Sequence, residues 1–134
     1  MREITSHRSP AWNHLNESIF IHAMDEPGPG GACLKYKVVI PVMKPVEASA
    51  SDKPREWDGV DVTFQSGDPR KGVNGISNEA LLAIVEDRLI GFQSGRFACI
   101  ENANALTKIQ EALLWLGKRS HDREERGVAG TQEA

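Results

Sequence analysis

Residues 77–93 read SNEALLAIVEDRLIGFQ, and their pattern is the strongest structural signal in the chain. Ser77 is suited to cap a helix, because its hydroxyl can accept a hydrogen bond from a backbone amide of the first turn, where Glu79 is also favourable. Large apolar side chains then recur at helical spacing, at Leu81, Leu82, Val85, Leu89 and Phe92. The sequence therefore predicts a helix from about Asn78 to Gln93.

A second, longer helix is predicted directly after this one. Ser94 and Gly95 offer a turn, and the helical spacing of apolar residues then continues at Phe97, Ile100, Leu106, Ile109, Leu113 and Leu116. Trp115 widens the apolar surface beyond a single stripe, so we expect the sheet or another subunit to cover it. The spacing predicts an αα-hairpin over residues 77–126, followed by a tail over residues 127–134.

The residues before the hairpin predict strands. Runs of β-branched and aromatic residues bounded by turn residues predict three strands, at about 18–24, 33–40 and 59–65. Residues 44–58 are rich in Pro, Ser, Ala and charge without a sustained period, which predicts a mobile loop. We therefore expect an α+β fold in a single domain over residues 1–134. Its β-rich half, 1–76, forms a small N-terminal antiparallel β-sheet, and the αα-hairpin follows.

The composition excludes several classes of partner. The 16 basic and 19 acidic residues give a formal charge of −3, which argues against a broad basic face that binds nucleic acid polymers. Cys33 and Cys99 lie far apart, so the sequence suggests neither a zinc site nor a disulfide framework. The N-terminus lacks the apolar segment of a signal peptide, and no apolar run is long enough to cross a bilayer. We expect a soluble protein in a reducing cytoplasm, without a membrane partner.

The sequence offers no constellation of catalytic residues. Its four histidines are scattered, and it lacks the nucleophile-elbow, zinc-protease, Walker and dinucleotide-binding motifs. The glycine-rich stretch 28–31 lacks the Lys-Ser/Thr ending and the following helix of a phosphate loop, and is read as a turn. We therefore expect no catalytic residue, no metal and no cofactor.

Arg119 and Arg123 are a candidate phosphate-binding pair. Their four-residue spacing turns both guanidinium groups to one side of the second helix, if that helix continues past Gly117, and Arg126 lies one turn further. A guanidinium is a planar fork of donors that matches phosphate oxygens. The alternative is a solvated helix end whose charge is balanced by Asp122, Glu124 and Glu125.

Phe92 and Asn102 allow two interpretations each. Phe92 either packs in the core of the hairpin or offers a stacking surface for an adenine base. Asn102 either faces solvent or bonds across the helices, or its amide reads the edge of that base.

The chain resembles a known family at several motifs. The continuous stretch is 77–102, SNEALLAIVEDRLIGFQSGRFACIEN, followed by Lys118-Arg119, Arg123 and the Arg126-Gly-Val-x-Gly-Thr131 ending. Further motifs are MREITSH at the N-terminus, Pro-Gly-x-Gly-Gly-Ala ending at Ala32, Phe-Gln-x-Gly at 64–67 and Gly-Val-Asn-Gly at 72–75. Together they are similar to the phage Thoeris anti-defence sponges of type one, whose helical hairpin is shared with the anti-CBASS sponge.

The resemblance implies a function and a site. Such a protein binds the cyclic ADP-ribose isomers made by Thoeris TIR enzymes and holds them without cleavage, in the cytoplasm of the infected bacterial host. By matching positions, the ligand-binding residues are Phe92 at the base, Asn102 beside it, and Arg119 and Arg123 at the phosphates. Members of the family form a homodimer, with ligand where the subunits meet, and some form a hexamer with further pockets for cyclic di- or trinucleotides. The competing functions are a hydrolase of the same messengers and a structural, oligomerising phage protein.

Overall fold

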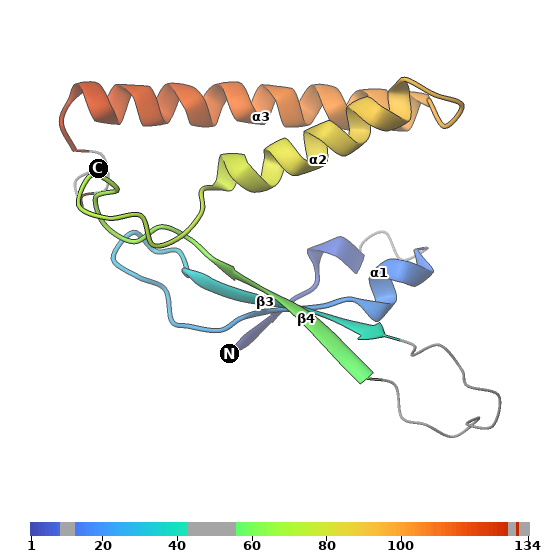
Figure 1. Ribbon diagram of the computed structural model, residues 1–134, viewed down its shortest axis with the longest axis horizontal. Coiled ribbons are helices and arrows are strands. Elements are labelled where there is room, and N and C mark those ends of the chain that lie inside the picture. The colour runs from blue at the N-terminus through green and yellow to red at the C-terminus, as the bar shows by residue number, and fades with distance from the viewer. Residues whose placement is uncertain (9–12, 43–55, 129–130, 132–134) are drawn as a thin grey trace. The chain divides into compact units, whose positions relative to one another are not determined.

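The computed structural model describes residues 1–8, 13–42, 56–128 and 131, and its fold is α+β (Figure 1). Its contacts divide the chain into two compact units, Met1–Thr63 and Phe64–Ala134. The first unit holds an antiparallel sheet and the second holds the two long helices, as the sequence predicts. The single domain over residues 1–134 stays a prediction.

The sheet of the first unit has four strands in the order β1-β2-β3-β4, and every neighbouring pair is antiparallel. The strands are β1 (Arg2–Ile4), β2 (Phe20–Ala23), β3 (Lys35–Val42) and β4 (Glu56–Thr63). The register aligns one apolar residue from each strand in a row across the sheet, in the order Ile4, Ile21, Val38 and Val60. Since side chains alternate between the faces of a strand, this row identifies the apolar face of the sheet.

Several boundaries differ from the sequence-based expectation. The expected loop at 44–58 is wrong at its end, because β4 already begins at Glu56, where it pairs with Val42 of β3. The rest of that loop, 44–55, lies outside the described residues. The N-terminal part contains three elements that the sequence pattern does not predict: the edge strand β1, the short 3-10 helix η1 (Ser6–Arg8) and the helix α1 (His14–Ser18). These three elements are only three to five residues long, too short to show a period.

The second unit is built on a helical hairpin of α2 (Asn78–Gln93) and α3 (Ile100–Glu125), which pack against each other (Figure 1). α2 begins where the sequence predicts, because the Ser77 hydroxyl accepts a hydrogen bond from the Ala80 amide at 3.1 Å. The apolar spacing placed Phe97 in the second helix, but α3 begins only at Ile100. Its cap is Cys99, whose sulfur accepts a hydrogen bond from the backbone amide of Asn102 at 3.4 Å. Among the described helices, none is long and apolar enough to cross a membrane.

The hairpin leaves much apolar surface open to solvent. No residue of α2 or α3 is fully buried. Four large apolar side chains on or beside these helices are more than 60 % exposed: Phe97, Ile100, Leu114 and Trp115. An apolar surface of this kind favours association with a further protein surface.

A tightly bonded loop, residues 64–76, joins β4 to α2. Gln65 and Ile76 are linked by a backbone hydrogen bond of 2.9 Å between the Gln65 amide and the Ile76 carbonyl. The Asn74 side chain accepts from the Ser66 amide and donates to the Ser66 carbonyl, both at 2.8 Å. The Asn74 amide in turn donates to the Gln65 side chain at 2.8 Å. The loop is therefore held closed by its own polar groups.

Candidate functional site

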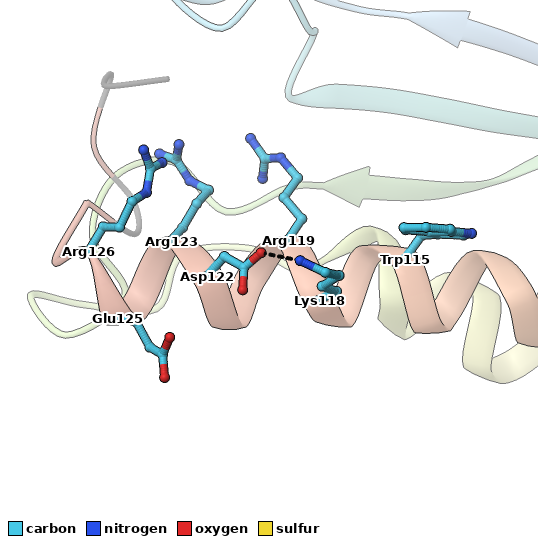
Figure 2. Close-up of a pocket in the computed structure, with 7 residues that line it drawn as sticks. All are labelled: Trp115, Lys118, Arg119, Asp122, Arg123, Glu125 and Arg126. Atoms are coloured by element: carbon cyan, nitrogen blue, oxygen red, sulfur yellow. Dashed lines mark hydrogen bonds and ion pairs between the residues drawn. The ribbon is translucent and has the colours of Figure 1, made fainter.

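The C-terminal half of α3 carries a row of guanidinium groups. Arg119, Arg123 and Arg126 project from the same side of the helix, and the indole of Trp115 lies on that side as well (Figure 2). Spacings of four, four and three residues produce this alignment, because an α-helix turns once in 3.6 residues. The structure therefore brings Arg119 and Arg123 together on one face, and α3 does continue past Gly117 to Glu125.

These side chains border an open depression of about 760 Å³. Its lining holds four cationic and two acidic side chains beside the one aromatic ring: Trp115, Lys118, Arg119, Asp122, Arg123, Glu125 and Arg126. Glu125 points to the opposite side of the helix from the arginines (Figure 2). Cationic side chains thus outnumber acidic ones around the depression, and Asp122 is the acidic residue that lies among the arginines.

Lys118 and His121 each approach an acidic residue one turn further along α3. The Lys118 ammonium donates to the Asp122 carboxylate at 2.7 Å, and this hydrogen bond holds the pKa of Asp122 below its ordinary value. His121 and Glu125 approach at 3.1 Å, one turn apart. The Asp122 carboxylate is therefore ionised and hydrogen-bonded to Lys118.

Arg123 is positioned by the end of the chain. Gly127 adopts a left-handed conformation with φ of 71°, which ends α3 and reverses the backbone. The Arg123 guanidinium then donates to the carbonyls of Val128 at 3.0 Å and Thr131 at 3.2 Å. Arg123 is half-buried as a result, whereas Arg119 is exposed and makes no hydrogen bond or ion pair with any described residue.

A second depression of about 410 Å³ also reaches both arginines. Its opposite wall is the loop of residues 64–76, through Gln65, Gly67 and Pro69. Both depressions lie within the unit Phe64–Ala134, and the loop and the end of α3 together line the second one.

Phe92 and Asn102 lie at the other end of the hairpin, where α2 ends and α3 begins. Phe92 is 39 % exposed, and the Arg88 guanidinium lies 5.5 Å from the centre of its ring. Asn102 is half-buried in the first turn of α3. Because a helix rises 1.5 Å per residue, the 17 residues from Asn102 to Arg119 separate them by about 25 Å along α3. One chain thus forms two separate pairs, rather than one cluster of four residues.

Sequence reasoning missed Trp115 as a site residue. Its position among leucines predicts an apolar surface that the sheet or another subunit covers, and in the structure its side chain is 65 % exposed and borders the arginine depression. The signal that was available is its spacing, one turn before Arg119. Within the described part of the chain, no group of three or more His, Cys, Asp or Glu residues is placed to hold a metal ion.

Comparison with known proteins supports the resemblance seen in the sequence. Residues 58–120 match the family described as the Acb2/Tad1 hairpin domain. The chain is also 53 % identical over 73 residues to Thoeris anti-defense 1 of Bacillus phage SBSphiJ7, a match that covers 54 % of this chain. It spans about half, 51 %, of the length of that relative. The segment that forms most of β4, α2 and most of α3 therefore matches the Acb2/Tad1 hairpin domain, in a chain closely similar over half its length to Thoeris anti-defense 1.

Proposed function

We propose that this protein is a phage anti-defence protein that binds cyclic ADP-ribose isomers made by Thoeris TIR enzymes and sequesters them without cleavage. The observation that carries the proposal is the aligned Arg119–Arg123 pair at an open depression, in a hairpin domain of the Acb2/Tad1 type. The similarity to Thoeris anti-defense 1 supports the choice of messenger.

The arginine pair suits the phosphates of such a messenger. Cyclic ADP-ribose isomers carry two linked phosphates, and two guanidinium groups one helical turn apart can each donate to one of them. A sequestering protein needs affinity and abundance rather than stabilisation of a transition state, so this role requires no nucleophile or general base. The messenger is removed from solution, and the downstream effector stays unoccupied.

A complete site requires two copies of the chain. The span of about 25 Å between Asn102 and Arg119 along α3 is too long for one small messenger to contact both pairs in one chain. In a homodimer with antiparallel α3 helices, Phe92 and Asn102 of one copy face Arg119 and Arg123 of the other, and twofold symmetry produces two identical sites. The exposed apolar side chains around the start of α3, Phe97 and Ile100, supply surface for that association.

Mixing two binding-deficient variants tests the two-copy site. We expect the Phe92→Ala variant and the Arg119→Ala variant each to bind cyclic ADP-ribose isomers weakly. Co-expression of both should restore about a quarter of the wild-type sites, because half of the dimers are mixed and each mixed dimer has one intact site of its two. Calorimetric titration of the co-expressed protein measures the number of restored sites.

Two controls make this experiment decisive. Co-expression of Arg119→Ala with Arg123→Ala should restore nothing, since both substitutions affect the same half of the site. Co-expression of Asn102→Ala with Arg119→Ala should restore the same fraction of sites as the pair with Phe92→Ala. This second pair separates the loss of ligand contact from any loss of packing around the Phe92 ring. Failure of every mixed pair to regain tight binding would contradict a site shared between two copies.

A further inference from the structure

Trp115 is an exposed aromatic side chain that the proposed function does not use. Its side chain is 65 % exposed, and it borders the same depression as the arginines. Exposing a large aromatic ring to water forgoes the free energy that its burial would contribute. The ring is therefore a candidate contact for a ligand that the arginines hold.

The placement of the ring suits a base. Trp115 precedes Arg119 by one turn, which corresponds to about 6 Å along the helix axis. Figure 2 shows the indole edge-on above α3, on the arginine side, so that one face of the ring is turned away from the helix. In a nucleotide, one ribose separates the base from its phosphate, a span comparable to one helical turn. A phosphate on Arg119 thus places the base of the same ligand within reach of the open face of Trp115.

We infer that Trp115 is a base-stacking residue of the arginine site, and that the site takes ligands of the nucleoside diphosphate class. Arg119 and Arg123 hold the diphosphate and Trp115 holds the base, all within one chain. Where the ligand is a cyclic ADP-ribose isomer, which rests on the proposed function, the adenine lies with one face on Trp115 and the other on Phe92 of the second copy.

The neighbouring Leu114 supplies a matched comparison. Leu114 is 76 % exposed on the same helix, but it does not border the depression. If Trp115 serves only in subunit association, Trp115→Ala and Leu114→Ala should both change the oligomeric state. A role in stacking predicts that only Trp115 affects ligands, and only those that carry a base.

The test compares ligands with and without a base. Purified wild type, Trp115→Ala, Trp115→Phe and Leu114→Ala are titrated with ADP, with a panel of cyclic ADP-ribose isomers and with inorganic pyrophosphate. Stacking on an aromatic ring corresponds to about a 5- to 150-fold gain in affinity, so Trp115→Ala should weaken ADP binding by such a factor. Its pyrophosphate affinity, the affinities of Leu114→Ala and the oligomeric state in light scattering should match wild type. Trp115→Phe should retain most of the affinity for ADP.

Two results would overturn the inference. One is unchanged ADP affinity in Trp115→Ala, and the other is an equal loss for ADP and pyrophosphate together with a changed oligomeric state. The proposed function fails separately: wild-type protein that binds ADP through Trp115 but none of the cyclic isomers would refute the messenger and leave the stacking role standing. Tight binding of a cyclic isomer to Trp115→Ala would refute the stacking role alone.

Discussion

Replacing Arg119 and Arg123 together by Ala should weaken the binding of cyclic ADP-ribose isomers by about two to four orders of magnitude. A hydrogen bond to a charged group contributes about 1.5–3 kcal/mol, and each 1.4 kcal/mol corresponds to about a factor of ten in affinity. Arg119 is exposed and lacks a partner among the described residues, so its removal costs the fold little. Calorimetric titration of the double variant measures the loss, and thermal unfolding checks the fold.

The single variants separate ligand contact from structure. Arg123 also donates to the carbonyls of Val128 and Thr131, so Arg123→Ala should loosen the end of the chain as well as weaken binding. Arg119→Lys should bind the messenger only slightly more tightly than Arg119→Ala, because an ammonium lacks the planar fork of donors that a guanidinium offers. The matched control is Lys108→Ala, which removes an 80 % exposed cation from the same helix away from the depression. If the double variant bound like wild type, the arginine pair would have no place in the site.

Gly75→Ala should lower the free energy of unfolding by about 3 kcal/mol, at the upper end of what added atoms cost in a packed region. A Cβ at position 75 would lie 2.3 Å from the carbonyl carbon of Phe64, 2.5 Å from its oxygen and 2.6 Å from the Gln65 nitrogen. These are backbone atoms that cannot rotate away, so the loop of residues 64–76 must open. Because Gln65 borders the second depression, binding should weaken too. Thermal unfolding and titration measure the two effects.

Gly91→Ala is the matched control for this variant. Nothing lies within 4 Å of a Cβ added at position 91, inside α2, where Ala is also the better helix former. Its unfolding temperature should equal or slightly exceed that of wild type. Wild-type stability in Gly75→Ala would mean that the close approach of Gly75 to Phe64 is not required for folding.

The long helices could be predicted from the sequence because local signals agree over many residues. The bounds of α2 follow from the Ser77 cap and from the spacing of its apolar side chains. The start of β4 could not be predicted in the same way. Residues 56–58 carry no period of their own and become a strand because they pair with β3, as Trp57 does with Pro41. Such pairing depends on residues distant in the sequence.

The candidate site shows the same division. The four-residue spacing placed Arg119 and Arg123 on one face of α3, since helical geometry alone determines that relation. The contacts of Arg123 with Val128 and Thr131 depend on the reversal of the chain at Gly127, which spacing does not reveal. These contacts depend on tertiary structure. The separation of Asn102 from Arg119, by contrast, follows from the 17-residue spacing once both lie on one helix.

Recovery of an intact messenger from the protein tests the proposed sequestration most directly. The purified protein is incubated with cyclic ADP-ribose isomers and cyclic di- and trinucleotides, filtered to remove free ligand, heated, and the released molecules are identified by mass spectrometry. The Arg119→Ala/Arg123→Ala variant, processed in parallel, measures the free ligand that filtration fails to remove. We expect wild type to release a cyclic ADP-ribose isomer chemically unchanged, in an amount that does not fall with incubation time. Linear ADP-ribose that accumulates with time, or the absence of any retained isomer, would contradict sequestration.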